Sequence, residues 1–281
     1  MIIWLPSYPK SGNTWLRYFI LSLLFGNKKE IHLDRLKNIQ QFPSKSQFEG
    51  INMDFNNIRE VAKNWIPIQS KVNRDKQIRF YKTHNIFCKI DNSSFTNYNN
   101  SLGVIYIVRD PRNVITSIKN HFHYNSYKEA KEFIFDEIRI THIPNAKISN
   151  YPLPQFIGSW QTHYKSWKNM NKNFLLIKYE NLLLSPETEF QKIADHLEKL
   201  LKTKFNKEQV HKAIDNSSYD RLKKMEEKHG FFESVINKKT GERKKFFYLG
   251  PKNNWRNILD ETIVDEINNK FEPEMKELGY L

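Results

Sequence analysis

The sequence predicts an α/β fold with a central parallel sheet and helices on both of its faces. Residues 1–5, 102–108 and 174–180 contain apolar runs of strand length. Continuous apolar runs rich in β-branched residues are typical of strands buried on both faces of a parallel sheet. After the first two runs, apolar residues recur at helical spacing. Strands that alternate with helices in this way favour a parallel sheet.

The first strand leads through a short loop into a helix. Pro6 and Pro9 stiffen this loop, and Gly12 lets its backbone approach a ligand closely. The apolar residues of the helix are Leu16, Phe19, Ile20, Leu23 and Leu24. The free N–H groups of residues 12–15 lie at the positive end of that helix, and Lys10 adds a full charge. We therefore expect an anion-binding site in this loop.

The order of residues in the loop distinguishes it from the nucleotide-binding P-loop. That motif has two glycines around four residues and then Lys followed by Ser or Thr, whereas here Lys10 precedes Gly12. Residues 8–15, Tyr-Pro-Lys-Ser-Gly-Asn-Thr-Trp, instead resemble the 5'-phosphosulfate loop of the sulfotransferases that use 3'-phosphoadenylyl sulfate (PAPS). Taken alone, the stretch also allows an ordinary strand-to-helix turn with a solvated lysine.

A second strand, predicted within residues 77–84, ends in Lys82-Thr83-His84. Ligands of open α/β sheets bind at the carboxyl ends of the strands, and an imidazole titrates near neutral pH, so His84 is a candidate general base. The triplet resembles the Lys-Thr-His of the sulfotransferases, whose histidine is the catalytic base. For an isolated histidine, a surface position at a strand end is the alternative.

The strand at residues 102–108 ends at Arg109, and Asp110 and Pro111 suit the start of a helix. Ser117 lies two turns into that helix, so Arg109 and Ser117 are placed to bind a phosphate together. The block resembles the 3'-phosphate site of the same family. Two alternatives stay open. In the first, Arg109 pairs with a neighbouring carboxylate and Ser117 bonds only its own helix; in the second, the segment is a magnesium-binding Walker B segment. The second is disfavoured because the Arg109 cation beside Asp110 competes with magnesium.

Later blocks extend the resemblance. Residues 156–167 have helical spacing, and Gly-Ser-Trp at 158–160, with His163 and Trp167, matches a segment of the cytosolic sulfotransferases. A role as core aromatics is the alternative, and it is the favoured interpretation of this helix. The family's adenine-contacting positions correspond to Trp15, Tyr179, Ser217 and Tyr219, which are equally plausible as core residues.

The C-terminal part departs from the family pattern. Residues 226–249 are strongly charged and predicted to form a loop or lid, and an amphipathic helix is expected over residues 259–271. Between them the family has Arg-Lys-Gly, which contacts the 3'-phosphate. Here Gly250 remains, but Tyr248 and Leu249 replace the two cations. Weakened phosphate binding, a changed donor preference and lost activity are all open outcomes, and so is compensation by Arg243, Lys244, Lys245 or Lys252.

Composition limits the compartment and the partners. Lys and Arg number 45 against 31 Asp and Glu, a net charge of +14 that favours anionic partners or forms a solvated face. No nucleic-acid-binding motif accompanies it, so we expect no nucleic acid partner. His121, His123 and His142 lack metal-ligand spacing, so we expect no metal. One cysteine, no room for a signal peptide and no membrane-spanning run predict a soluble cytoplasmic protein.

The blocks together predict one sulfotransferase domain over residues 1–281, with a fold similar to the sulfotransferase branch of the P-loop folds. The predicted reaction transfers a sulfuryl group from PAPS to a hydroxyl or amine of a small-molecule, sugar or lipid acceptor, leaving adenosine 3',5'-bisphosphate (PAP). The predicted catalytic residues are His84, Lys10, Lys82 and Ser117. The predicted donor-binding residues are Lys10, Ser11, Gly12, Asn13, Thr14, Trp15, Arg109, Ser117, Tyr179, Ser217, Tyr219 and Gly250. A non-catalytic binder of nucleotides or polyanions and a magnesium-dependent P-loop phosphotransferase are the alternatives. The acceptor and the oligomeric state stay open.

Overall fold

The computed structural model describes residues 1–26, 31–141, 151–235, 241 and 243–281. The chain forms two compact units. Unit 1 consists of residues 1–8, 39–108 and 135–177, and unit 2 of residues 9–38, 109–134 and 178–281. Because the backbone crosses between them repeatedly, each unit is built from segments that are far apart in the sequence.

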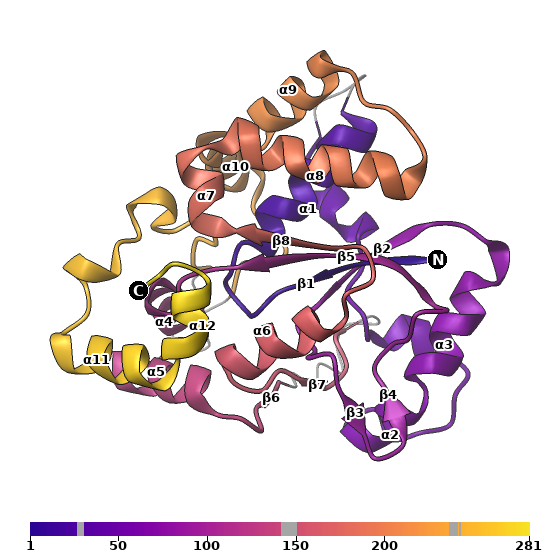
Figure 1. Ribbon diagram of the computed structural model, residues 1–281, viewed down its shortest axis with the longest axis horizontal. Coiled ribbons are helices and arrows are strands. Elements are labelled where there is room, and N and C mark those ends of the chain that lie inside the picture. Colours follow the sequence, from indigo (N-terminus) through magenta and orange to yellow (C-terminus); the bar gives the residue numbers. More distant parts are fainter. Residues whose placement is uncertain (27–30, 142–150, 236–240, 242) are drawn as a thin grey trace. The chain divides into compact units, whose positions relative to one another are not determined.

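A central parallel sheet, flanked by helices, confirms the predicted fold class (Figure 1). In spatial order its strands are β2 (Arg79–Thr83), β1 (Ile2–Pro6), β5 (Ser101–Val108) and β8 (Phe174–Lys178). The strand β1 pairs in parallel with β2 on one side and with β5 on the other. Every residue of β1 is buried. The predicted strands are therefore confirmed, with ends shifted by a few residues.

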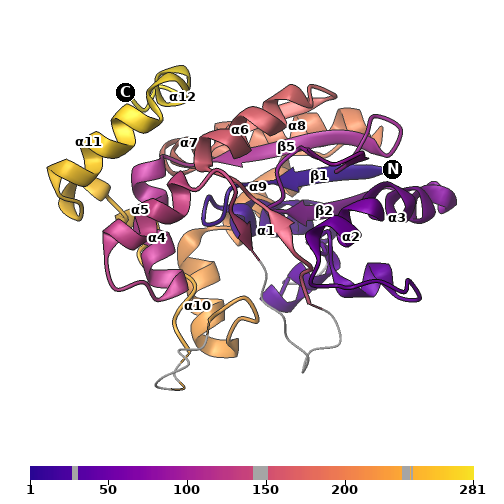
Figure 2. The same ribbon diagram turned by 90° about the horizontal axis from the view of Figure 1, so that it is seen from below.

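Helix α6 (Trp160–Asn169) packs on one face of this sheet, and Figures 1 and 2 show it alongside the strands. Its Trp167 ring lies 6.2 Å from the Trp4 ring of β1, and its Tyr164 ring lies 5.9 Å from the Tyr106 ring of β5. All four rings are buried. The alternative of core aromatics is thus correct for most of this helix, which begins later than its apolar spacing predicted, after the short strand β7 (Gln155–Phe156).

The rest of unit 1 contains helices that the sequence did not predict, because residues 39–76 have no clear periodicity. Trp65 at the start of one of them is fully buried, with its ring 5.1 Å from that of Phe95. The remaining elements of unit 1 are η2 (Lys45–Phe48), α2 (Ile58–Lys63), α3 (Trp65–Val72), η3 (Asn73–Asp75), β3 (Lys89–Ile90), β4 (Ser93–Ser94) and β6 (Ile140–Thr141).

Unit 2 is mainly helical. The predicted helix start at Pro111 is confirmed, since Asp110 caps it by accepting a hydrogen bond from the Arg112 N–H. The terminal helix predicted over residues 259–271 corresponds to α11, and a further short helix, α12, follows it after Phe271. The helices of unit 2 are α1 (Asn13–Phe25), η1 (Leu33–Asn38), α4 (Pro111–Phe122), α5 (Tyr127–Phe135), α7 (Tyr179–Leu184), α8 (Pro186–Leu201), α9 (Lys207–Asn216), α10 (Tyr219–His229), η4 (Gly250–Lys252), η5 (Trp255–Asn257), α11 (Glu261–Lys270) and α12 (Glu272–Glu277).

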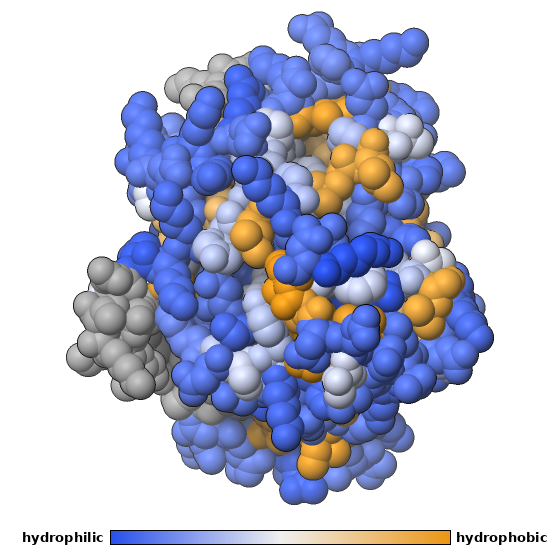
Figure 3. Space-filling view, turned by 90° about the vertical axis from the view of Figure 1, so that its left-hand side faces the viewer, coloured by the Kyte–Doolittle hydropathy of each residue, from blue (hydrophilic) through white to orange (hydrophobic). Residues whose placement is uncertain are grey.

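The face drawn in Figure 3 is dominated by hydrophilic residues, with smaller hydrophobic groups between them. This agrees with a chain in which 27% of the residues are charged. Among the described residues, no helix is both long enough and apolar enough to cross a bilayer.

Candidate functional site

The first loop has the backbone geometry of an anion-binding site. Lys10 and Gly12 both have left-handed backbone conformations, with φ of 69° and 102°. Gly12 is the N-cap of α1 and offers no side chain to cap it, and the first turn carries no acidic residue. The first N–H groups of a helix lack acceptors in a preceding turn and carry partial positive charge. The prediction of free N–H groups is wrong for Trp15, whose N–H donates to the Gly12 carbonyl oxygen at 3.0 Å. The loop is therefore suited to an external anion.

Two buried polar atoms of this loop support that conclusion. Ser11 Oγ and Trp15 Nε1 are both buried and have no hydrogen-bond partner among the described residues. Buried polar atoms are normally hydrogen-bonded, so such atoms in one loop are consistent with a polar ligand. The residues present thus fit a phosphate-bearing donor at this position.

Thr14 has a protein partner that the sequence did not reveal. Its hydroxyl donates to Glu233 Oε2 at 2.9 Å, and Arg17 Nη2 lies 2.7 Å from Glu233 Oε1. The side chains of Arg17 and Glu233 are 2% and 16% exposed. A carboxylate paired with an arginine therefore lies against the first turn of α1.

Arg109, predicted to bind the 3'-phosphate, lies against the first loop. Its Nη1 donates to the Lys10 carbonyl oxygen at 3.1 Å, and its guanidinium lies 4.2 Å from the centre of the Tyr179 ring. The Tyr179 ring is in turn 5.7 Å from the Trp15 ring in an edge-to-face arrangement. Unit 2 therefore brings together Lys10, Trp15, Arg109 and Tyr179, although they come from three separate segments.

Next to Arg109, a buried acidic group was not singled out from the sequence. Glu180 accepts from the Asp110 N–H at 3.0 Å and from the Tyr280 hydroxyl at 2.9 Å. Burial raises the pKa of the Glu180 carboxyl above its usual value, and the Arg109 charge opposes this. A buried carboxyl, hydrogen-bonded to the residue that follows Arg109, thus belongs to this region of unit 2.

The Lys10 ammonium lies over an aromatic ring from the charged C-terminal region. Its Nζ is 4.1 Å from the centre of the Phe246 ring. The backbone N–H groups of Phe246 and Phe247 donate to the two oxygens of the buried Glu226 carboxylate, at 2.6 and 2.9 Å. The described part of the predicted loop or lid is thus anchored on α10, which continues to His229. Residues 236–240 and 242 of this segment lie outside the described residues.

Two of the predicted adenine contacts make hydrogen bonds within the chain. The Ser217 hydroxyl donates to the Ala213 carbonyl oxygen at 2.6 Å. The Tyr219 hydroxyl lies 3.2 Å from the Phe247 carbonyl oxygen and 3.0 Å from that of Tyr248. Gly250 has φ of +51°, and a Cβ there would lie 2.1 Å from Tyr219 Cε2. Tyr219 therefore holds the end block, residues 247–250, directly against its ring.

The helix that carries Ser117 is also tied to the C-terminal region. Ser117 is half-buried on α4. The preceding Thr116 donates from its hydroxyl to Asn253 Oδ1 at 2.7 Å, and the Trp255 N–H donates to Asn113 Oδ1 at 3.0 Å. The C-terminal segment therefore supports α4, which carries Ser117 and begins just after Arg109, the other residue of the predicted phosphate pair.

His84 lies in unit 1 and is fixed through its ring and its backbone. Its Nδ1 is 2.7 Å from the Ser7 carbonyl oxygen. A carbonyl oxygen can only accept, so Nδ1 carries a proton, and in the neutral imidazole Nε2 then carries the lone pair. The His84 N–H donates to Gln155 Oε1 at 2.9 Å. This tautomer is the one that a base acting through Nε2 requires.

Lys82 precedes this histidine on β2 and is half-buried. Its backbone N–H donates to the Gln40 carbonyl oxygen at 3.0 Å, and its own carbonyl oxygen accepts from the Phe42 N–H at 2.8 Å. The backbone that positions the Lys82 side chain is thus held from one side by residues 40–42.

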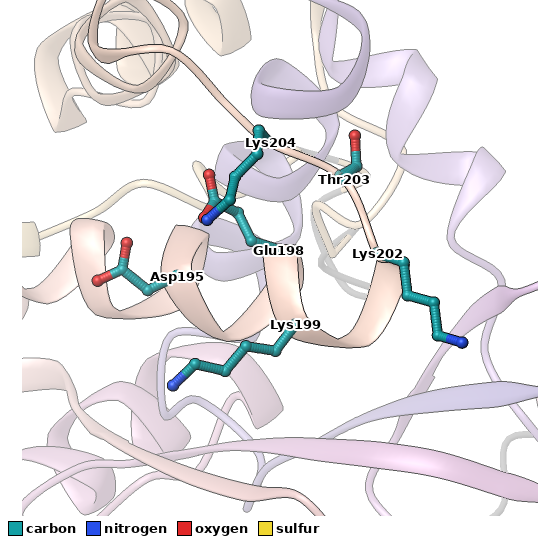
Figure 4. Close-up of a pocket in the computed structure, with 6 residues that line it drawn as sticks. All are labelled: Asp195, Glu198, Lys199, Lys202, Thr203 and Lys204. Carbon is teal, nitrogen blue, oxygen red and sulfur yellow. The ribbon is translucent and has the colours of Figure 1, made fainter.

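A surface pocket at the C-terminal end of α8 contains none of the predicted site residues. Figure 4 shows Lys199 and Lys202 pointing in different directions. Lys204 forms an ion pair with Glu198, with 2.7 Å between Nζ and Oε2. The pocket is lined by Asp195, Glu198, Lys199, Lys202, Thr203 and Lys204. These solvated charges of both signs do not form a site for one kind of ligand.

No cluster of three or more potential metal ligands occurs within residues 1–26, 31–141, 151–235, 241 and 243–281. His142, one of the histidines considered for a metal site, lies outside these residues.

Comparisons with known proteins agree on one family. The chain is 25% identical to sulfotransferase 2A1 of Macaca fascicularis over 276 residues, which cover 97% of this chain and 83% of that protein. It is 23% identical to cytosolic sulfotransferase 12 of Arabidopsis thaliana, over 98% of this chain and 77% of that protein.

Solved structures show the same fold. Mouse sulfotransferase SULT7A1, complexed with PAP, matches with a TM-score of 0.60 and 19% identity, over 98% of this chain and 84% of that one. Retinol dehydratase, in complex with androsterone and the inactive cofactor PAP, matches with a TM-score of 0.63 and 17% identity. The match covers 98% of this chain and 80% of that one. The sulfotransferase domain model matches residues 2–279, so the chain belongs to the sulfotransferase domain family, as its motifs predicted.

Proposed function

We propose that this protein transfers the sulfuryl group of PAPS to a hydroxyl or amine of a small-molecule acceptor, with residues 1–281 acting as one sulfotransferase domain. Its family membership supports this activity, and so do the PAP complexes of proteins with the same fold. The cytosolic relatives support a cytoplasmic location.

His84 is the proposed general base. The acceptor oxygen or nitrogen forms a bond to sulfur while the bond from sulfur to the bridging phosphate oxygen breaks, and the acceptor proton passes to His84 Nε2. The bonding electrons leave with the 5'-phosphate of PAP, so charge and atoms balance. Lys10 stabilises the charge that develops on the leaving phosphate oxygen, and Lys82 steadies the sulfuryl oxygens.

Unit 2 is the proposed donor site. The backbone N–H groups of residues 12–15, with Ser11, Asn13 and Thr14, hold the 5'-phosphate, and Arg109 with Ser117 holds the 3'-phosphate. Trp15, Tyr179, Ser217 and Tyr219 lie beside the adenine, and Gly250 closes the end block. In the structure the Thr14 hydroxyl donates to Glu233. Its role toward phosphate therefore requires that it exchange or share this partner.

One observation carries the proposal. In unit 2, Arg109 is hydrogen-bonded to the carbonyl of Lys10, in the loop whose left-handed residues begin α1. Such an arrangement provides a fixed cation beside the positive end of a helix, which suits a ligand with two phosphates rather than one.

Calorimetric titration with PAP and with AMP, in the presence of EDTA, tests the donor site. We expect PAP to bind much more tightly than AMP. In Arg109→Ala, PAP affinity falls about 10- to 150-fold, which corresponds to about 1.5–3 kcal/mol for a hydrogen bond to a charged group. The exposed Arg35 of unit 2 supplies the matched control, because Arg35→Ala removes the same charge from a protein with net charge +14.

Four results would count against the proposal. Equal binding of PAP and AMP contradicts a 3'-phosphate site, and equal losses in Arg109→Ala and Arg35→Ala indicate only general electrostatic attraction. Binding that requires magnesium favours the phosphotransferase alternative. Tight PAP binding without sulfuryl transfer to any member of an acceptor panel favours the non-catalytic binder.

The acceptor panel contains a phenol, a steroid alcohol, a retinoid alcohol, a sugar and an arylamine. The androsterone and retinol complexes of retinol dehydratase motivate the lipid-like members. Residues 42–65 and 123–151 are the segments proposed to shape the acceptor site; of these, residues 142–150 lie outside the described part of the chain.

A further inference from the structure

His163 lies entirely within the core of unit 1, yet both of its ring nitrogens have specific partners. Its side chain is fully buried on α6. Nδ1 lies 2.8 Å from the Tyr106 hydroxyl, and Nε2 lies 3.2 Å from the carbonyl oxygen of His84. The imidazole is further enclosed by the Tyr8 and Tyr106 rings, whose centres are each 5.6 Å from its own.

The partners determine the direction of both hydrogen bonds. A carbonyl oxygen accepts only, so the proton is on Nε2 and points at the His84 oxygen. Nδ1 is then the acceptor, and the Tyr106 hydroxyl donates to it. Burial lowers the pKa of His163 to about 3 and raises the pKa of Tyr106 well above its usual value. Both groups are thus neutral at physiological pH.

We propose that His163 is a positioning residue for His84, and that Tyr106 selects the tautomer in which His163 holds the His84 carbonyl. This inference rests on the proposed role of His84 as the base. His163 reaches no substrate in this scheme and acts only through the His84 backbone.

The His84 residue is then held from three sides. Gln155 accepts from its N–H, His163 donates to its carbonyl oxygen, and the Ser7 carbonyl accepts from Nδ1 of its ring. Fixing both ends of the residue restricts the direction in which its side chain leaves the backbone. A displacement of about 1 Å in such a group can cost about 100-fold in rate.

Substitutions of His163 and Tyr106 separate the hydrogen bonds. His163→Gln keeps an amide N–H at the position of Nε2, whereas His163→Leu removes the donor at similar volume. Tyr106→Phe removes only the hydroxyl that selects the tautomer. Ser166→Ala is the matched control. The Ser166 hydroxyl accepts from the Phe87 N–H at 3.0 Å and donates to the backbone carbonyl oxygen of His163 at 2.8 Å, so its removal disturbs the same helix but not the two bonds of the His163 ring.

The primary measurement is the ¹⁵N spectrum of histidine-labelled protein, in which protonated and unprotonated ring nitrogens are well separated. His84→Ala and His163→Gln assign the two signals. We expect wild-type His84 to be protonated at Nδ1. In His163→Leu we expect a mixture of tautomers and faster exchange of the Nδ1 proton. In His163→Gln we expect the His84 signals to return to those of the wild type, and in Ser166→Ala we expect them to be unchanged.

Turnover supplies the second readout, with any acceptor that the panel identifies. We expect kcat to fall about 10- to 100-fold in His163→Leu and to recover largely in His163→Gln. PAP affinity is expected to stay within about 2-fold of the wild type, because the donor residues lie in unit 2. Tyr106→Phe is expected to lower kcat in the same direction but by less. If His163→Leu fails to fold, Tyr106→Phe tests the positioning role in its place.

The two proposals fail in different ways. An unchanged His84 spectrum in His163→Leu, or in Tyr106→Phe where that variant alone folds, overturns the positioning role whatever the turnover. A His84→Ala variant that keeps wild-type turnover overturns the base instead. If the His84 spectrum changes equally in Ser166→Ala and in His163→Leu, the cause is a general loosening of α6, and this result also overturns the positioning role.

Discussion

Gly250→Ala is expected to displace the end block that Tyr219 holds. Gly250 has φ of +51°, and a Cβ added there would lie 2.1 Å from Cε2 and 2.2 Å from Cζ of the Tyr219 ring. Atoms cannot remain at these distances, so either the ring or residues 247–250 must move. Both movements break the hydrogen bonds from the Tyr219 hydroxyl to the Phe247 and Tyr248 carbonyl oxygens.

The cost has two separable parts. Placing a non-glycine residue in the left-handed region costs about 1–2 kcal/mol, and overpacking adds about 1–3 kcal/mol. Gly50 provides the control, because it has φ of +82° with no atom within 4 Å of an added Cβ. Gly50→Ala should therefore show only the first part, and Gly250→Ala about 2–5 kcal/mol in total.

Urea denaturation of both variants measures these losses in the free energy of unfolding, and calorimetry measures their PAP affinity. We expect Gly250→Ala to be the less stable and to bind PAP more weakly, whereas Gly50→Ala binds like the wild type. If the two variants lose the same stability and bind PAP equally well, Tyr219 does not fix the end block and the reasoning is wrong.

Two further predictions concern the contribution of buried ionisable side chains to stability. Glu233→Ala leaves the Arg17 guanidinium buried without its carboxylate and should lower the free energy of unfolding by about 3 kcal/mol in urea denaturation; a loss below about 0.5 kcal/mol would place this pair among ordinary surface pairs. His163 is neutral in the folded protein, because burial lowers its pKa from 6.5 to about 3. Its contribution to stability is therefore complete above pH 6.5 and is lost, by up to about 1.4 kcal/mol per pH unit, as the pH falls toward 3. In urea denaturation from pH 7 to pH 5, His163→Gln should lose less stability than the wild type, and parallel curves would contradict the assignment.

Local sequence patterns predicted those parts of the fold and site that depend on neighbouring residues. The strand before Arg109, the cap by Asp110 and the loop before α1 each follow from a few consecutive residues, and the structure has all three. The Arg109 bond to the Lys10 carbonyl was not predicted. The family resemblance implied only that both residues belong to the donor site, and they are 99 positions apart.

The contacts that the sequence did not predict are long-range pairs of ordinary polar residues. Thr14 and Glu233 are separated by 219 positions, and His84 and His163 by 79. Glutamate in a charged segment and histidine in an aromatic helix have no periodicity that distinguishes a buried partner from a solvated one. Tyr219 was placed beside adenine by motif alone, whereas its hydroxyl bonds to backbone carbonyls that no motif specifies.

The replacement of the family's two cations at positions 248 and 249 can be reversed without disturbing the end block. The Tyr248 side chain is 58% exposed, and the hydrogen bond that anchors this residue uses its backbone carbonyl. Side-chain changes there should therefore alter charge but not the backbone path. We expect Tyr248→Arg with Leu249→Lys to tighten PAP binding about 10- to 150-fold, the range for one added charged hydrogen bond.

AMP provides the control for this double variant, because it lacks the 3'-phosphate. Its affinity should change much less than that of PAP, and any common gain reports the added net charge alone. High salt reduces such a common gain but leaves a direct contact largely intact. If the ratio of PAP to AMP affinity does not rise, the 3'-phosphate does not reach residues 248–249, and Arg109 with Ser117 must account for its recognition without the end block.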